Sequence, residues 1–213
     1  MLQFVRNQLV FLRQFGRKFE TTGSLLPSSR FLAQTITRYL AQRGDTPIRV
    51  LECGPGTGAF TDSVVRHLRA GDRFDLVELN EAFVAVLKKR FATEAHWQAV
   101  SDLTEIHQLP LQEFRDQVPY DFIISGLPHL NFPPAVVETI TESYFRLLKP
   151  GGTLSYFEYL MIRPIKKKVA VGATRRKIHS VDKILAGYLQ EHRLCRDSVF
   201  LNVPPAWVQH LRT

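Results

Sequence analysis

The feature that most constrains this chain is a glycine-rich turn between a short buried strand and a helix. Residues 48–53 form an apolar run suited to a buried strand, and residues 60–68 carry the apolar spacing of a helix. Gly54, Gly56 and Gly58 lie between them. Glycine adopts backbone conformations closed to other residues, it lets a ligand approach the main chain, and a helix start behind it favours an anionic group. The sequence therefore predicts a turn that binds a ligand through its backbone.

A carboxylate follows the next predicted strand. Glu78 closes that strand, 20 residues after Gly58, where an acidic side chain can accept hydrogen bonds from both hydroxyls of a ribose. This pattern leaves alternatives open. It fits a nucleoside-bearing cofactor, it fits a purely structural glycine turn, and a permissive dinucleotide pattern is also satisfied by Gly54, Gly56 and Ala59.

Strands and helices alternate along the centre of the chain. Short apolar runs bounded by turn residues predict strands at 48–53, 74–79, 103–107, 120–125 and 153–158. Helical spacing predicts helices at 60–68, 81–91 and 134–148, preceded by one at 31–40 that Ser28 or Ser29 can cap. The alternation indicates an α/β protein with a doubly wound, mostly parallel sheet. We expect an N-terminal helical segment at 1–45 and a main domain at 46–213.

Composition excludes several classes of protein. The chain has 213 residues, 45% apolar and 23% charged, which suits one globular domain and not a disordered chain or a disulfide scaffold. Cys53 and Cys195 form no CxxC pair, so we expect no metal site and a reducing compartment. No uncharged apolar run approaches the ~18 residues of a membrane span. Arginines in the N-terminal segment argue against a signal peptide.

Positive charge is concentrated in two segments. The net charge is +8, but residues 163–183 alone hold eight basic side chains against one acid, Asp182. These are Arg163, Lys166, Lys167, Lys168, Arg175, Arg176, Lys177 and Lys183. Residues 1–30 hold Arg6, Arg13, Arg17, Lys18 and Arg30 against one acid, Glu20. Such patches suit nucleic acid or a lipid leaflet. We interpret 163–183 as a mobile basic loop that can hold a lipid phosphate, the alternative being a solvated charged loop.

The first segment has the pattern of an interfacial helix. Residues 2–19 predict a helix with an apolar stripe on one side and basic residues on the other, the stripe consisting of Leu2, Val5, Leu9 and Leu12 widened by phenylalanines. Cations opposite large aromatic residues are typical of a helix that lies on a membrane surface. The alternative is a helix that packs on its own domain and presents ordinary basic positions to solvent.

Two segments resemble class I S-adenosylmethionine (SAM) methyltransferases, namely Glu52-Cys53-Gly54-Pro55-Gly56-Thr57-Gly58 and Leu147-Leu148-Lys149-Pro150-Gly151-Gly152-Thr153-Leu154. The resemblance covers about residues 47–158 and implies a Rossmann-like sheet of seven strands with SAM as cofactor. It places the methionine part of SAM at Glu52, Gly54, Pro55, Gly56 and Gly58, the ribose at Glu78 and Leu79, and the adenine beside Leu109, Pro110 and Leu111. The acid common after strand three is missing at Pro110. Asp102 is the alternative if the register of that strand differs.

The expected acceptor side follows the fourth strand. Ser125-Gly126-Leu127-Pro128-His129 is similar to the Asn-Leu-Pro-Tyr motif of amino-group methyltransferases, with Gly126 in place of asparagine and His129 in place of the aromatic residue. The loss of amide and stacking ring argues against an adenine acceptor, and a tight turn without a catalytic role is the alternative. Gly-Leu-Pro here resembles bacterial phospholipid N-methyltransferases, and the likeness extends along nearly the whole chain through residues 26–30, 156–159 and 200–208.

This resemblance implies a SAM-dependent N-methyltransferase that acts on the amino head group of a membrane lipid (phosphatidylethanolamine and its methylated forms, or ornithine lipid). Candidate catalytic residues are Gly126, Leu127, Pro128, His129, Tyr156, Glu158 and Tyr159. Candidate lipid-binding residues are Arg6, Arg13, Arg17, Lys18, Ser28, Ser29, Arg30, Lys166, Lys167, Lys168, Arg175, Arg176 and Lys177.

For this reading we expect an anionic membrane surface and the aminolipid as partners, with no nucleic acid and no obligate protein partner. The protein is then expected in the cytoplasm, associated peripherally with the inner leaflet of the cytoplasmic membrane. The alternatives are an rRNA adenine N6-methyltransferase and a non-catalytic SAM-binding adaptor.

Overall fold

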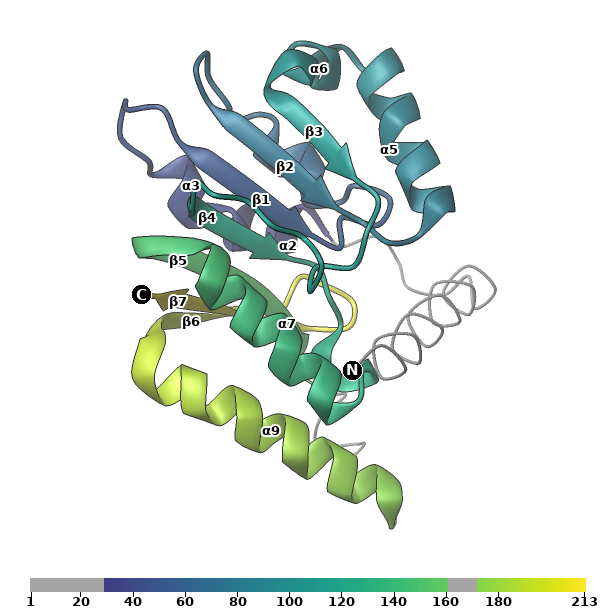
Figure 1. Ribbon diagram of the computed structural model, residues 1–213, viewed down its shortest axis with the longest axis vertical. Helices are drawn as coiled ribbons and strands as arrows, with labels where there is room; N and C mark the ends of the chain where they lie inside the picture. The colour runs from purple at the N-terminus through teal and green to yellow at the C-terminus, as the bar shows by residue number, and fades with distance from the viewer. Residues whose placement is uncertain (1–28, 161–171) are drawn as a thin grey trace.

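One sheet of seven strands organises the described part of the chain, which comprises residues 29–160 and 172–213 of a computed structural model (Figure 1). The strands are β1 (Arg49–Cys53), β2 (Arg73–Val77), β3 (Thr104–His107), β4 (Tyr120–Ser125), β5 (Leu148–Tyr159), β6 (Arg193–Val199) and β7 (Ala206–Arg212). Their order in the sheet is β3-β2-β1-β4-β5-β7-β6. The first five strands named run parallel, and β7 is antiparallel to both β5 and β6. The predicted α/β, doubly wound, mostly parallel sheet is confirmed.

The sheet order reverses between β1 and β4. From β1 the chain moves outward to β2 and β3, then returns to place β4 on the other side of β1. In such a sheet the loops after β1 and β4 leave in opposite directions, and the crevice between them at the carboxyl ends is where ligands bind. Those two loops are the glycine-rich turn and the segment that begins at Gly126.

Helices cover both faces of the sheet. They are α2 (Arg30–Ile36), α3 (Arg38–Ala41), α4 (Thr61–Val64), α5 (Glu81–Thr93), α6 (Ala95–Gln98), α7 (Pro134–Leu147) and α9 (Ala173–His192), with short 3-10 turns η1 (Ser101–Leu103) and η2 (His129–Asn131). Figure 1 shows α7 and α9 side by side on one face. There α7 and α9 bury Val136, Val137, Ile140, Val181 and Leu185. On the other face the apolar core includes Leu32, Ile36, Val64, Leu87 and Trp97.

Most expected elements are present, with shifted ends. β4 matches its prediction, whereas β5 begins five residues before the expected 153 and the helix expected at 60–68 shortens to α4. The prediction of a loop at 163–183 is wrong from Ala173 onward, because the residues from there belong to the helix α9. Its buried residues Ile178, Val181, Leu185 and Leu189 recur at helical spacing, and the last three belong to the core shared by α7 and the sheet. The high density of basic side chains had hidden this apolar stripe.

Several expectations concern residues outside the described part of the chain. These are the helix at 2–19 and the candidate lipid-binding residues Arg6, Arg13, Arg17, Lys18, Ser28, Lys166, Lys167 and Lys168. They stay predictions. Within the part that the structure describes, each helix is too short or too polar to cross a membrane.

Candidate active site at the carboxyl ends of the strands

The glycine-rich turn adopts the conformation that its residues predict. Gly54, Gly56 and Gly58 have φ angles of +68°, +58° and +89°, values that other L-residues rarely adopt. The amide of Gly54 donates to Val77 O at 2.9 Å, and the amide of Gly58 donates to Pro55 O at 2.9 Å, which closes the turn. The helix that follows, α4, has only four residues. The turn therefore presents backbone groups, with little contribution from a helix dipole.

Glu78 joins the turn after β1 to the turn after β2. Its Oε2 accepts a hydrogen bond from Gly56 N at 3.0 Å, and its Oε1 accepts one from Asn80 N at 2.8 Å. The side chain is buried, and this burial raises the pKa of Glu78, although the bonds from Asn80 and Gly56 oppose the effect. Leu79 lies between Glu78 and the N-cap of α5. The carboxylate thus has the position that the sequence predicted, with its orientation set by two backbone amides.

Glu52 lies beneath the same turn and is fully buried at the end of β1. Burial raises the pKa of Glu52 to about 8, and the polar groups of Thr61 oppose this effect only in part. At neutral pH the side chain is consequently a carboxylic acid, which can donate a hydrogen bond. This location agrees with the predicted place of Glu52 in the cofactor region. As a protonated acid it can donate a hydrogen bond, which a carboxylate cannot do.

The expected adenine-flanking loop directly follows β3. Leu111 is buried in the core beside α7, Leu109 packs against that core from a half-buried position, and Pro110 is buried. Glu78 N donates to His107 O at 3.1 Å, so the carboxyl end of β3 adjoins the residue expected to bind the ribose. Asp102 precedes β3 and therefore lies toward the opposite edge of the sheet. The register expected for β3 holds, and Asp102 is not placed at this site.

The acceptor loop lies directly against the glycine-rich turn. Gly126 N donates to Cys53 O at 2.9 Å. A Cβ atom at position 126 would lie 2.5 Å from Gly54 O, and a Cβ at position 54 would lie 2.4 Å from a side-chain carbon of Leu127. Two loops that are distant in sequence therefore touch through their backbones. The contact requires glycine at position 126, because the backbone of Gly54 fills the space that a side chain there would need.

A buried polar chain supports the acceptor loop. Ser125 Oγ lies 2.6 Å from the hydroxyl of Tyr144, which lies 3.2 Å from His129 Nε2. Ser125 Oγ also accepts a hydrogen bond from Leu127 N at 3.2 Å. The ring of Tyr156 meets that of His129 edge-on, with centroids 5.0 Å apart. Burial raises the pKa of Tyr144 well above its ordinary value, so its hydroxyl keeps its proton.

Tyr144 was not among the residues singled out from the sequence. It follows Val137 and Ile140 on the apolar stripe of α7, where an aromatic residue reads as ordinary core. Only the packing of α7 on β4 brings its hydroxyl to Ser125 and His129. The one available signal was a tyrosine in a fully apolar stripe, because a buried tyrosine hydroxyl needs a polar partner.

The alternation of β5 separates the other catalytic candidates. Tyr156 belongs to the core beside α7, whereas Phe157 and Tyr159 pack on the opposite face, with ring centroids 5.2 Å apart. Glu158 lies two residues after Tyr156 and therefore on the same face of β5. It is 6% exposed, so it is a buried glutamate. The structure thus brings Tyr156 to His129 and directs Tyr159 away from it.

An arginine on α5 binds the carbonyl groups at the end of the glycine-rich turn. Arg90 Nη1 donates to Thr57 O at 3.0 Å and to Gly58 O at 3.1 Å. Its guanidinium lies 4.0 Å from the ring centroid of Trp97, and its Nε donates to Glu94 Oε1 at 2.6 Å. Charge-assisted bonds to carbonyl groups are stronger than neutral ones. Arg90 on α5 therefore fixes the end of a loop that lies more than thirty residues earlier, a role that no sequence motif indicated.

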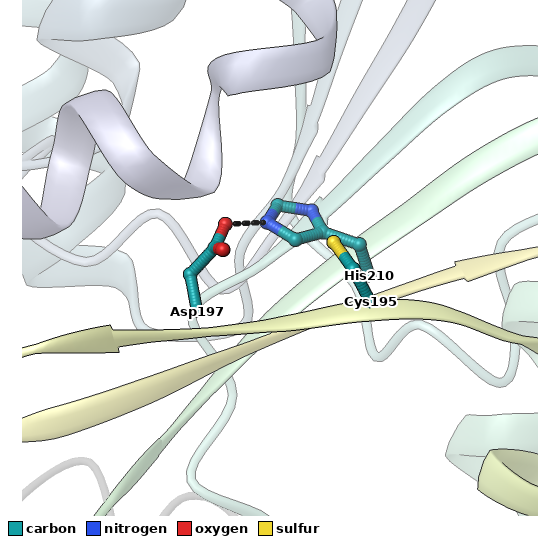
Figure 2. Close-up of side chains that lie close together, drawn as sticks. All are labelled: Cys195, Asp197 and His210. Atoms are coloured by element: carbon teal, nitrogen blue, oxygen red, sulfur yellow. Dashed lines mark ion pairs between the residues drawn. The ribbon is translucent and has the colours of Figure 1, made fainter.

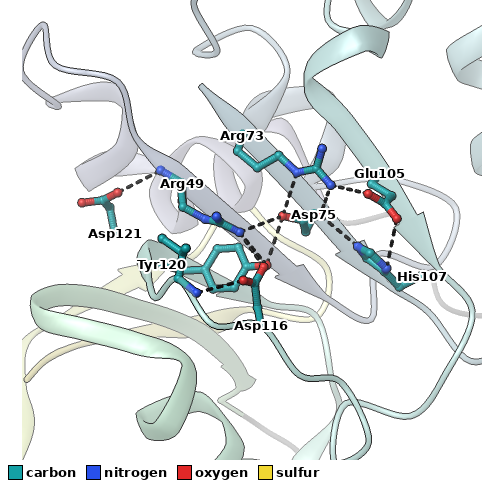
Figure 3. A network of polar contacts seen from close by, with 9 residues as sticks. Arg49, Arg73, Asp75, Glu105, His107, Asp116, Tyr120 and Asp121 are labelled. Carbon is teal, nitrogen blue, oxygen red and sulfur yellow. Dashed lines mark hydrogen bonds and ion pairs between the residues drawn. The ribbon is translucent and has the colours of Figure 1, made fainter. Parts of the chain in front are cut away.

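A network of charged residues ties the central strands together (Figure 3). Asp75 on β2 is almost fully buried. It lies 3.1 Å from Arg73 Nη2 and 2.8 Å from His107 Nε2, and it accepts a hydrogen bond from the Tyr120 hydroxyl at 3.0 Å. Arg49 Nη2 on β1 lies 3.7 Å from the same carboxylate. The network thus joins β1, β2, β3 and β4 and supports the strands that carry the site.

A second group of polar side chains lies on the β6–β7 hairpin (Figure 2). His210 Nε2 lies 3.3 Å from Asp197 Oδ2, with Cys195 beside them. Arg38 occupies this group as a cation, since its Nη1 lies 2.8 Å from Asp197 Oδ2 and its Nη2 donates to Cys195 Sγ at 2.9 Å. Burial lowers the pKa of His210 to about 4, so the ring is neutral. Arg38 and Asp197 thus form an ion pair on the β6–β7 hairpin. In the sheet, β4 and β5 separate this hairpin from β1, which leads into the glycine-rich turn.

The described lipid-binding candidates divide into two groups. Ser29 caps α2 through its side chain, and Arg30 is exposed on the first turn of that helix. Arg175 and Arg176 are exposed near the start of α9. Lys177 differs, because its Nζ donates to Asn131 O of η2 at 3.0 Å. The start of α9 is therefore joined to the segment that carries His129.

The sequence matches the methyltransferase domain family over residues 50–152. The fold is that of solved methyltransferases, among them the O-methyltransferase from Bacillus cereus in complex with SAH, with a TM-score of 0.66, 14% identity, and coverage of 95% of this chain and 90% of that one. Residues 50–152 form a class I methyltransferase domain. Its cofactor is SAM.

Two curated relatives illustrate the activities of similar proteins. The chain is 28% identical over 152 residues to an ornithine lipid N-methyltransferase of Singulisphaera acidiphila, covering 71% of this chain and 77% of that protein. It is 23% identical over 171 residues to ribosomal RNA small subunit methyltransferase A of Pseudomonas fluorescens. That match covers 75% of this chain, which spans about half (51%) of the ribosomal RNA enzyme.

The residues present fit SAM. Gly54 and Gly56 keep side chains out of the turn, the buried carboxylate of Glu78 can accept ribose hydroxyl donors, and apolar Leu109 can flank the adenine. When bound, SAM supplies a methyl group made electrophilic by its sulfonium. The chain's own contribution is a cradle whose shape is set by backbone contacts with Gly126 and by Arg90.

We expect Gly126→Ala to weaken SAM binding at least tenfold, about 1.4 kcal/mol or more. The added methyl group meets Gly54 O at 2.5 Å, so the acceptor loop and the glycine-rich turn must separate. Isothermal titration calorimetry with SAM measures the effect, and circular dichroism verifies the fold. Gly44→Ala is the matched control, because its Cβ meets nothing within 4 Å. An unchanged affinity in Gly126→Ala would contradict the backbone contact.

Arg90→Gln is expected to raise the KM for SAM by about tenfold, the scale of one or two lost charge-assisted bonds, with a smaller effect on kcat at saturating SAM. The variant loses the bonds to the carbonyl groups of Thr57 and Gly58 that position the turn. Arg66→Gln serves as control, because Arg66 shares Asp62 with Arg90 but has His96 as its other partner in place of the turn. Equal KM values for the two variants would show that Arg90 does not position the turn.

The buried Glu52 predicts a pH dependence of stability. Its pKa of about 8 in the folded chain lies above the ordinary value of 4.5, so between these pH values the native state holds a proton that the unfolded state has lost. The free energy of unfolding therefore falls as pH rises toward 8, by up to ~1.4 kcal/mol per pH unit, and this contribution levels off above pH 8.

Urea unfolding at pH 5.5, 6.5 and 7.5 tests this expectation through the difference between wild type and Glu52→Gln. The variant keeps a neutral side chain and loses the Glu52 contribution to the slope. Glu94→Gln should leave the slope unchanged, because the Arg90 hydrogen bond lowers the pKa of Glu94 and that group stays ionised throughout this range. Parallel curves for wild type and Glu52→Gln would refute the assignment.

Proposed function

We propose that this methyltransferase transfers the SAM methyl group to the amino nitrogen of a membrane lipid, either phosphatidylethanolamine and its methylated forms or an ornithine lipid. The observation that carries the proposal is the contact of Gly126 N with Cys53 O. Through it the loop expected to hold an amine lies against the turn expected to hold SAM. Alignment of donor and acceptor is the main contribution that a protein makes to such a transfer.

The chain's own groups supply the other requirements. The backbone of Gly126 and Leu127 positions the amine. A reacting amine must first lose its proton, and a closed pocket favours this because desolvation lowers the pKa of an ammonium group. His129 is the proton acceptor in this proposal, with its ring held by the Tyr144 hydroxyl at Nε2 and by the edge of Tyr156. The buried Glu158, on the same face of β5, is the second candidate.

The lipid part of the proposal is supported by the curated relative that acts as an ornithine lipid N-methyltransferase and covers similar shares of both chains. It is also supported by charge, since Arg175 and Arg176 are exposed near the start of α9, which is joined to η2 by Lys177. Basic residues near an anionic leaflet each add about 1 kcal/mol to binding. Peripheral association with the inner leaflet of the cytoplasmic membrane is part of the same proposal.

A second candidate function is methylation of an rRNA adenine. The match to a ribosomal RNA methyltransferase favours it. The acceptor loop favours the lipid, because Gly126 offers no amide side chain and position 129 holds a histidine, edge-on to Tyr156, where the adenine-directed motif carries a stacking aromatic ring. A third possibility, a SAM-binding adaptor without catalysis, is separated from both by the experiment below.

Incubation of the protein with radiolabelled SAM, mixed bacterial lipids and, in parallel, rRNA tests the proposal. We expect label in phosphatidylethanolamine derivatives or in ornithine lipid. His129→Gln should lower that rate by about 10²-fold or more, as removal of a general base does, with SAM affinity retained. His192→Gln, at the far end of α9, is the control. Label in rRNA alone would support the second candidate, and bound SAM without any labelled product would support the adaptor.

A further inference from the structure

The connection between β6 and β7 presents apolar side chains to solvent. Phe200, Leu201 and Val203 are 70%, 67% and 69% exposed. Among residues 29–160 and 172–213 these are the most exposed large apolar side chains, followed by Val118 at 51%. Singly exposed apolar residues are ordinary, but three within four positions form a patch that marks an interaction site.

The exposed residues are held in place by a buried asparagine. Asn202 is 2% exposed, its Oδ1 accepts a hydrogen bond from Ser29 N at 2.9 Å, and its Nδ2 donates to Pro204 O at 2.8 Å. Pro205 O also accepts a bond from Leu160 N at 2.8 Å. The neighbours of Asn202 consequently point outward from a fixed turn. Their exposure is a property of the folded turn and not of a frayed chain end.

This turn lies at the same end of the sheet as the site, namely at the carboxyl ends of the parallel strands. Ala206, the first residue of β7, pairs with Tyr159 at the carboxyl end of β5. Figure 1 shows the β6–β7 connection in yellow at the end of the sheet toward which the β4 arrow points. The exposed Arg30 follows Ser29, to which Asn202 is bonded. The exposed apolar side chains and Arg30 therefore lie at the end of the sheet where the glycine-rich turn and the acceptor loop meet.

We propose that Phe200, Leu201 and Val203 insert into the headgroup and acyl-chain boundary of a bilayer that contains anionic lipid, and so turn the active-site edge toward the membrane. This inference rests on the proposed lipid substrate. The patch has only three side chains, far short of the ~800 Å² per partner that a stable protein interface buries. A few apolar side chains beside cations suffice for reversible binding at a bilayer surface, and the net charge of +8 favours an anionic one.

Fluorescence tests insertion directly. Phe200→Trp places an indole at the turn, and vesicles of phosphatidylglycerol and phosphatidylethanolamine with brominated acyl chains quench an indole that enters them. We expect quenching of Phe200→Trp above the wild-type background. Val118→Trp is the matched control, because Val118 is exposed just before the amino end of β4, on the opposite edge of the sheet. Equal quenching of the two variants, or none in Phe200→Trp, would overturn the proposal.

A double variant, Phe200→Ser with Leu201→Ser, tests the consequence for activity. We expect vesicle affinity and methylation of vesicle lipid to fall about tenfold or more, the scale of two buried apolar side chains. Methylation of a short-chain, monomeric phosphatidylethanolamine and SAM affinity should stay at wild-type levels. Val118→Ser, the matched control, should behave as wild type in all four assays.

The short-chain lipid separates this inference from the proposed function. If wild type methylates neither short-chain nor vesicle aminolipid, including ornithine lipid, the proposed function fails. If wild type methylates both and the double variant equals it on vesicles, the insertion proposal alone is wrong. Light scattering adds a further outcome, because a change from oligomer to monomer in the double variant would assign the patch to contacts between copies of this chain and overturn membrane insertion.

Discussion

The site depends on one backbone contact between two loops at the switch point of the sheet. Gly126 N bonds to Cys53 O, and the carbonyl of Gly54 occupies the space where a side chain at position 126 would lie. Because β1 and β4 are neighbours in the sheet, the two loops leave adjacent strand ends, and only glycine lets them meet. The loop after β4 therefore lies against the glycine-rich turn after β1.

Buried and half-buried charges surround that contact and hold its parts in register. Glu78 bonds to the amide of Gly56, and Arg90 bonds to the carbonyl groups of Thr57 and Gly58, so the middle and the end of the turn are both held. Below the strand ends, Asp75 gathers partners from neighbouring strands. Such groups are costly to bury unless they are paired. The hydrogen bonds that satisfy these buried groups therefore also hold the glycine-rich turn in place.

Much of the cofactor side was predictable because it is local in sequence. A strand, three glycines and a carboxylate at the next strand end follow rules of backbone geometry and alternation, and the structure places Gly54, Gly56 and Glu78 accordingly. The acceptor side was less predictable. Tyr144 reads as core until α7 is packed on β4, and the basic composition near α9 concealed its apolar stripe. Tyr159 was grouped with Tyr156, although the alternation of β5 directs them to opposite faces.

The sequence by itself determined the fold class and the conformation of the glycine-rich turn, because these follow from the order of residues and their local backbone preferences. The methyltransferase domain was recognisable from the sequence through its similarity to a known family. Tertiary structure alone decided which distant groups meet. Arg90 reaches the turn, and Asn202 bonds to Ser29 across 173 positions of the chain. Hydrophobic patterning specifies which face of an element is buried, but the partner on that face is chosen only when helices and strands pack in three dimensions.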